Sequence, residues 1–180
     1  MKKVIYSLVL LLVVAGGLVL ANRGTKSETP KKPKPRVLTA AEKQAALKNW
    51  EASPDGIKYK QWEASPVGKK VYASEAKIMK NVRAFSNMEA VVTSLSLPPG
   101  SRLGFGVMVK INGEDFILSF GLEEPMEFKQ LHSLKVNDSI LIKSHVVSHA
   151  PKYAYPIVSG DYVERDGKVI YKRKPRKGGC

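Results

Sequence analysis

The stretch that decides the fold is Gly-Phe-Gly-Val-Met-Val-Lys-Ile-Asn-Gly-Glu-Asp-Phe-Ile-Leu-Ser-Phe, residues 104–120. Its β-branched and alternating residues predict one strand over 104–111 and a second over 115–120. Asn112-Gly113 lies between them and is typical of a type I′ turn, because both residues adopt positive φ at little cost. The stretch therefore predicts a β-hairpin at the centre of an antiparallel sheet.

Strand-like sequence continues on both sides of this hairpin. We expect further strands at 89–97, 138–149, 157–163 and 168–171, separated by turn residues such as Pro98-Pro99-Gly100 and Asp166-Gly167. Residues 123–134 contain a cluster of glutamates and predict a short acidic helix or loop. The predicted order is three meandering strands, a connection of helical size, and the remaining strands.

Two short segments resemble known β proteins. Leu134-Lys135-Val136-Asn137-Asp138 followed by Ile140-Leu141-Ile142 looks like the entry to the fourth strand of an OB-fold, with Asn137 where glycine is common. Ser159-Gly160-Asp161-Tyr162-Val163 resembles small envelope proteins of uncharacterised function that contain an OB-like domain. The resemblance covers about residues 85–172 and implies a five-stranded antiparallel barrel. The alternative is an open antiparallel sheet packed on the preceding helices.

Residues 39–84 are predicted to be helical and contain one internal echo. Trp50-Glu51-Ala52-Ser53-Pro54 recurs twelve residues later, beginning at Trp62. Each Ser-Pro pair suits an N-cap followed by the first helical residue, so we expect three helices starting near Thr39, Pro54 and Pro66. Trp50 and Trp62 are candidate anchors for a membrane surface or a partner; the alternative is that they pack short helices onto the domain.

Residues 1–21 combine a short basic start with an apolar run over 4–21. This length suits either a retained single-pass anchor in a bacterial inner membrane or a signal peptide cleaved on export to the periplasm. Basic residues after the run favour the anchor, whereas the Lys-Lys start is common in exported proteins. Both alternatives, and the side on which the rest of the chain lies, remain open.

The formal net charge of +14 is concentrated outside the predicted sheet. The linker 22–38 is rich in proline and lysine, and its basic residues are candidates for contact with a membrane surface or partner: Lys31, Lys32, Lys34 and Arg36. The tail 173–180 is also basic, is expected to be disordered, and ends in Cys180, the single cysteine. Residues 85–165 hold 7 Lys or Arg against 9 Asp or Glu, which disfavours a fold built to bind nucleic acid.

The residues do not predict an enzyme. His145 and His149 lie four apart on a predicted strand, which places them about 13 Å apart and too far to share a zinc ion. His132 lies in the connection, where the glutamates at 123, 124 and 127 suggest a solvated face. The chain has no G-x-S-x-G elbow and no phosphate-binding loop. We therefore expect no catalytic residues, no metal and no cofactor.

A recognition surface is the remaining prediction. In an OB-like domain, the loops between strands one and two and between strands four and five flank the ligand, here 97–102 and 148–156. The candidate ligand-binding residues are Tyr153, Tyr155, Lys152, His149, Arg102, Phe105 and Lys110, with Phe116 as a further choice. The alternative for the two tyrosines is that they pack their loop onto the sheet.

These observations favour a non-enzymatic OB-like binding module, tethered to a membrane or exported, that recognises a protein or polymer of the cell envelope. A second hypothesis is a membrane-held nucleic-acid-binding protein facing the cytoplasm, because both ends of the chain are basic. A third is a structural subunit of a membrane assembly docked through the helices that carry Trp50 and Trp62.

Overall fold

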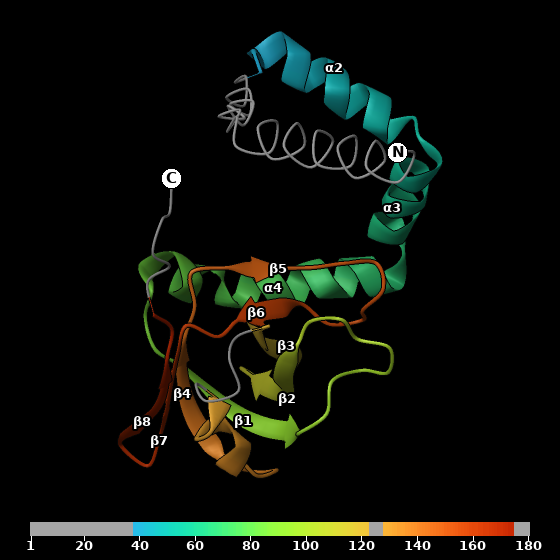
Figure 1. The fold of residues 1–180 in the computed structure, drawn as a ribbon. Coiled ribbons are helices and arrows are strands. Elements are labelled where there is room, and N and C mark those ends of the chain that lie inside the picture. The colour runs from blue at the N-terminus through green and yellow to red at the C-terminus, as the bar shows by residue number, and fades with distance from the viewer. Residues whose placement is uncertain (1–37, 123–127, 175–180) are drawn as a thin grey trace, which may run out of the picture. The chain divides into compact units, whose positions relative to one another are not determined.

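A computed structural model describes residues 38–122 and 128–174 (Figure 1). The chain divides into two compact units at Lys43–Gln44, inside the first described helix. The sheet and the following helices belong to the second unit, which contains the functional surface discussed below. The predicted leader 1–21 lies outside the described residues. So do the predicted linker 22–38, apart from Leu38, and the predicted tail 173–180, apart from Arg173 and Lys174.

Three helices occupy the places that the Ser-Pro pairs predict: α2 (Ala40–Glu51), α3 (Pro54–Ala64) and α4 (Pro66–Ala84). At the start of α2, Thr39 and Glu42 form a capping box: the Thr39 N–H donates to Glu42 Oε2 at 2.8 Å, and the Glu42 N–H donates to Thr39 Oγ1 at 3.3 Å. The Thr39 N–H bond, followed by a bond of 3.0 Å that the Thr39 hydroxyl donates to Glu42 Oε2, lowers the pKa of Glu42. Each helix therefore begins at a residue whose side chain satisfies a free backbone N–H group.

The sequence echo builds the same helix–helix corner twice. In each copy the serine hydroxyl donates to the tryptophan carbonyl at 2.6 Å and accepts from a glycine N–H, Gly56 at 3.2 Å and Gly68 at 3.1 Å. A Cβ on either glycine would lie 2.1 Å from the tryptophan carbonyl oxygen. The corner therefore requires the serine hydroxyl and the glycine, since glycine allows the close approach to the tryptophan carbonyl.

α4 connects the helices to the sheet. Its buried residues recur at helical spacing, Val71, Ser74, Ile78 and Val82, and the last two belong to the main hydrophobic core. α4 lies beside the short strand β5 (Val147–Ser148) (Figure 1). The helix ends at Phe85, whose φ of 47° is left-handed, a conformation in which glycine is usual.

Eight strands form one mixed sheet in the order β5-β6-β3-β2-β1-β4-β7-β8. Besides β5, they are β1 (Met88–Ser94), β2 (Phe105–Ile111), β3 (Glu114–Gly121), β4 (Ser139–Lys143), β6 (Ile157–Ser159), β7 (Tyr162–Arg165) and β8 (Lys168–Lys172). All neighbours are antiparallel except β3 and β6, which are parallel. In the central hairpin β2–β3, Ile111 lies opposite Glu114 across the predicted two-residue turn.

The predicted five-stranded barrel preceded by a transmembrane or signal helix is wrong as a fold class. The sheet has eight strands and is not closed into a barrel, with β5 and β8 at its edges. The arrangement matches the alternative of an open sheet packed on the preceding helices, although its β3–β6 pair is parallel. The resemblance to OB-fold proteins itself remains a prediction.

Two of the six predicted strand segments are each broken in two, which gives the eight strands observed. Residues 138–149 break at Ser144, whose hydroxyl donates to the Val146 carbonyl at 2.8 Å and accepts from the Val146 N–H at 3.1 Å. Residues 157–163 break at Gly160 and Asp161. The Gly160 N–H donates to Ser119 of β3 at 2.8 Å, whereas the Asp161 N–H donates to Lys143 of β4 at 3.1 Å. The hydrophobic periodicity of the sequence does not indicate such a change of pairing partner.

The turn predictions are confirmed. Asn112 and Gly113 have φ values of 50° and 81°, and Asp166 and Gly167 have 53° and 71°, as type I′ turns require. Asn137 adopts a φ of 73°, which confirms that asparagine replaces glycine there in a left-handed conformation. These short motifs fix the two hairpins and the entry to β4.

The sheet has a core on each face. The larger core includes Val92, Val109, Phe116, Phe120 and Ile142, together with the α4 residues. The smaller core, on the opposite face, consists of Met108, Ile117, Tyr153 and Ile157, with Leu97, Leu103, Ala150 and Tyr155 packed against it. The loop that precedes β2 and the loop that precedes β6 therefore cover only part of the second face.

The predicted membrane-spanning helix finds no support in the structure. Within residues 38–122 and 128–174, no helix has both the length and the apolar character needed to cross a membrane. The apolar run at 4–21, on which that prediction rested, falls outside this range.

Candidate functional site

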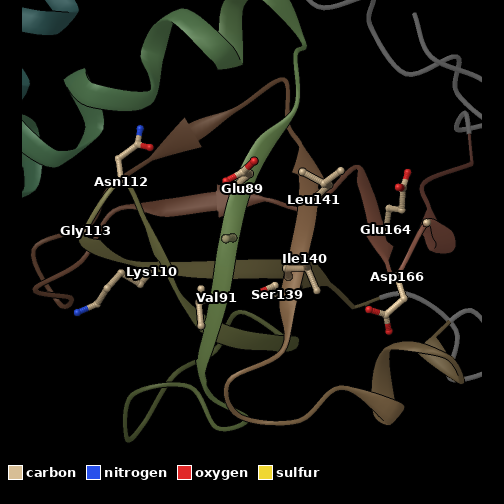
Figure 2. A pocket seen from close by; sticks show the side chains of 12 residues that line it. Glu89, Val91, Lys110, Asn112, Gly113, Ser139, Ile140, Leu141, Glu164 and Asp166 are labelled. Carbon is tan, nitrogen blue, oxygen red and sulfur yellow. The ribbon is translucent and has the colours of Figure 1, made fainter.

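The uncovered part of the second face forms a groove of about 600 Å³ (Figure 2). β1 runs along it, with β4 and β7 on one side and the end of the β2–β3 hairpin on the other. Val91 is 39% exposed although it sits in a central strand. An apolar side chain left open on a central strand is a candidate contact for a partner.

Strand register places the groove residues in two rows. In one row Glu89 lies opposite Leu141, and Leu141 lies opposite Glu164. In the other, Val91 lies opposite both Ser139 and Lys110. Since neighbouring strands are about 4.8 Å apart, Glu89 and Glu164 have their backbones roughly 10 Å apart, with Leu141 between them.

The groove carries more negative than positive charge. Glu89, Glu164 and Asp166 line it, with Lys110 as the one cation among the lining residues. Lys110 Nζ lies 3.7 Å from Asp115, so its charge is partly compensated. Glu164 accepts a hydrogen bond of 2.6 Å from the Tyr162 hydroxyl, and this bond, together with burial, raises the pKa of Tyr162. The site combines an apolar floor with a carboxylate on each side.

The sequence-predicted loops contact each other but contribute no residue to the lining of this groove. Tyr153 is 6% exposed; its hydroxyl donates to Ser101 Oγ at 3.2 Å and accepts from the Arg102 N–H at 3.4 Å. Lys152 is exposed, donates to the Gly100 carbonyl, and lies 5.6 Å from the Tyr153 ring centre. Tyr155 is half-buried against the same small core. This geometry favours the alternative stated above, that the tyrosines hold the loops on the sheet.

Three other predicted residues lie on β2 and β3. Phe105 is half-buried and stacks on Phe128 with ring centres 5.0 Å apart, and Phe116 is fully buried in the main core. Their side chains belong to the packing of the protein. Lys110 is exposed and lines the groove, so it is the one member of the predicted set that the structure places in the candidate site.

His149 is part of a hydrogen-bonded cluster between the helices and β5. Its Nδ1 lies 2.9 Å from Glu75 Oε2, and its Nε2 lies 2.8 Å from the Tyr59 hydroxyl and 3.0 Å from the Tyr72 hydroxyl. Tyr72 donates to Glu63 Oε1 at 2.6 Å. Burial and this hydrogen bond raise the pKa of Tyr72. The cluster is half-buried and links α3 and α4 to the sheet.

The two tryptophans differ in their surroundings. Trp62 stacks on His149 with ring centres 5.6 Å apart, and its indole Nε1 is buried without a hydrogen-bond partner among the described residues. Trp50 is 43% exposed and contacts Tyr59 edge-on at 5.5 Å. Trp62 therefore packs the helices onto the domain, whereas Trp50 leaves much of its surface open.

The other predicted positions fall elsewhere. Lys31, Lys32, Lys34, Arg36 and Cys180 lie outside the described residues. His145 and His149 occupy different surroundings, because His145 stacks on Phe85 whereas His149 stacks on Trp62. In the described ranges, no group of three or more His, Cys, Asp or Glu side chains is arranged to hold a metal ion.

Sequence reasoning missed the groove carboxylates. Glu89 and Glu164 are the polar members of alternating strands, a pattern ordinarily explained by solvent. The strand order and register bring them together on either side of Leu141, and neither follows from local sequence. A search of protein-family models, curated proteins and solved structures finds nothing that matches the chain.

Proposed function

We propose that this protein is a non-enzymatic binding module whose groove takes a cationic, partly apolar segment of a partner protein. The observation that carries the proposal is the row Glu89–Leu141–Glu164, a half-buried apolar residue flanked by carboxylates from neighbouring strands. A segment with two lysines or arginines and an apolar side chain between them complements this row. Apolar contact supplies most of the affinity, while the carboxylates select the charge of the partner.

The charge of the groove disfavours nucleic acid as its ligand. Phosphates are bound by clusters of lysine and arginine, whereas the groove has three carboxylates against one lysine. The groove also contains no aromatic side chain on which a base could stack. A basic protein segment is therefore the better match among the partners that the sequence suggested.

Binding of a labelled peptide of alternating lysine and leucine to the full chain tests the proposal by fluorescence anisotropy. Leu141→Asn is expected to weaken binding by about tenfold, because it removes the apolar floor. Glu89→Gln combined with Glu164→Gln is expected to weaken it by about fivefold at low salt, since each surface ion pair contributes less than about 1 kcal/mol. Added salt should weaken binding to the wild type more than to the double variant.

Asp55→Asn is the matched control, because Asp55 is an exposed carboxylate at the start of α3 and does not line the groove. This control variant should bind the peptide as the wild type does. A peptide of alternating glutamate and leucine should bind weakly or not at all. The proposal fails if Leu141→Asn and the double carboxylate variant both retain wild-type affinity.

A further inference from the structure

A second pocket, of about 500 Å³, lies at the other end of β7 and β8 and has the opposite charge. Its lining includes Phe85 and His145 together with Lys172, Arg173 and Lys174. Nothing in the groove proposal uses these residues. The pocket combines an aromatic surface with a basic rim, so its chemistry differs from that of the groove.

The aromatic surface is a stacked pair. The rings of Phe85 and His145 lie 3.8 Å apart between centres at an angle of 19°. Phe85 holds this position with a left-handed backbone at the end of α4, where glycine would be unstrained. The His145 side chain is 65% exposed, so a flat ligand can reach it. The pair is a platform on which a further planar ring can stack.

His145 is held in place by Asp161. The carboxylate accepts from the His145 N–H at 2.8 Å and lies 3.1 Å from Nδ1. Because a carboxylate only accepts, Nδ1 carries the proton in this contact. Asp161 also pairs with Arg173, whose Nε lies 2.8 Å from its other oxygen. The imidazole ring is therefore oriented before any ligand arrives, and the Arg173 charge is balanced.

The remaining charge around the platform is positive. Lys172 and Lys174 line the pocket, and both are exposed. Lys143 Nζ lies 5.8 Å from the centre of the Phe85 ring, at the edge of the same surface. Asp161 is the one carboxylate among the described residues of the lining, and Arg173 balances it. A phosphate beside the platform would therefore lie near Lys172.

We propose that this pocket binds a nucleotide, with the planar base stacked on His145 and the phosphate beside Lys172 and Lys174. The stacking surface and the lysines supply the two chemistries that a nucleotide requires, a π-face and a phosphate. The same chemistry is offered by a free nucleotide and by one unit of a single-stranded nucleic acid. The pocket is independent of the acidic groove, so the two proposals can fail separately.

Calorimetric titration of the full chain with adenosine monophosphate tests the proposal, with adenosine and ribose 5-phosphate as partial ligands. His145→Ala should weaken binding by about tenfold, because base–aromatic stacking is lost. His145→Phe should retain most of the affinity, because it keeps a flat ring. Lys172→Ala should weaken binding about threefold at low salt, and both partial ligands should bind less tightly than the nucleotide.

Lys168→Ala is the control, since Lys168 is an exposed lysine on the same strand but does not line this pocket. It should bind the nucleotide as the wild type does. Tighter binding of a short oligothymidylate, with the same sensitivity to His145→Ala, would identify a single strand as the source of the nucleotide. The proposal is overturned if neither ligand binds at millimolar concentration, or if His145→Ala binds as tightly as the wild type.

Discussion

The acidic groove and the basic pocket lie at opposite ends of β7 and β8 and carry opposite chemistry. On β4, Leu141 lies in the groove, and two residues later Lys143 lies beside Phe85. On β7, Glu164 belongs to the groove, while Tyr162 lies under Lys143, with Nζ 5.2 Å from the ring centre. Residues two apart on a strand share a face and are separated by about 7 Å. The sign of the surface charge therefore changes between residues that are two apart on the same strand.

This difference shows how a nearly neutral fold can hold two charged surfaces. The groove lies where β4 pairs with β1 on one side and with β7 on the other, and the pocket lies where the chain enters β7 from β6. Net charge over residues 85–165 does not reveal the acidic groove, and it leaves out Lys172 and Lys174 of the basic pocket. The position of each charge in the sheet, rather than the total, determines which ligand it can meet.

Gly160→Ala is expected to have the largest effect and to damage both surfaces together. A Cβ at Gly160 would lie 2.4 Å from the ring of Phe120, which is fully buried. Overpacking of this kind costs about 1–3 kcal/mol of unfolding free energy. Chemical denaturation should show the loss, and both the peptide and the nucleotide should bind less tightly.

A double-mutant cycle identifies the cause of that loss. Phe120→Leu removes the ring atoms that the new methyl group would contact, at the cost of a cavity. If the clash is responsible, Gly160→Ala should cost less in the Phe120→Leu background than in the wild type. If Gly160→Ala lowers the free energy of unfolding equally in both backgrounds, a clash with Phe120 is not the cause of the loss.

Much of the local structure could be predicted from the sequence because short motifs specify it. Asn112-Gly113 and Asp166-Gly167 determine their own positive φ values, and the two Ser-Pro pairs start α3 and α4. The number of strands could not be predicted. The breaks at Ser144 and Gly160 occur where the chain exchanges one pairing partner for another, and that choice depends on distant strands.

The candidate sites were less predictable than the fold. The loop position of Tyr153 predicts a ligand-binding residue. In the structure the loop folds back and buries the Tyr153 ring against Met108 and Ile117. Glu89 and Leu141 form part of a site only because β1 pairs with β4 in one register. Phe85 and His145 are sixty residues apart in sequence and meet only in the folded chain. Long-range contacts of this kind leave no local pattern in a single sequence.

Asp138→Asn is expected to have a smaller effect, on the groove side alone. Asp138 precedes β4; its Oδ2 accepts from Arg165 at 2.8 Å and from the Lys135 N–H at 3.0 Å. The Arg165 bond, followed by the Lys135 bond, lowers the pKa of Asp138. Its stabilising contribution is therefore present above the unfolded pKa of about 3.9 and is lost as pH falls through the lower folded value.

Denaturation of wild type and Asp138→Asn across a pH series measures this contribution. At neutral pH the free energy of unfolding of the variant should be about 1 kcal/mol below that of the wild type. This difference should shrink as the solution is acidified below about pH 4. If the difference in unfolding free energy stays constant through this range, the ionised Asp138 carboxylate does not stabilise the contact between the start of β4 and Arg165 of β7. Nucleotide binding should be unchanged at neutral pH, because Asp138 does not line the basic pocket.

Tyr162→Phe is expected to have the smallest effect on stability and tests the link between the two surfaces. The Tyr162 ring lies under Lys143 at the basic side, while its hydroxyl donates to Glu164 at the acidic side. Phenylalanine keeps the ring but frees Glu164, at a cost of about 0.5–1 kcal/mol for one hydrogen bond. Peptide binding should change slightly as Glu164 gains freedom, and nucleotide binding should not change. If the affinities for the peptide and for the nucleotide fall equally, the two surfaces are coupled through Tyr162 and are not independent sites.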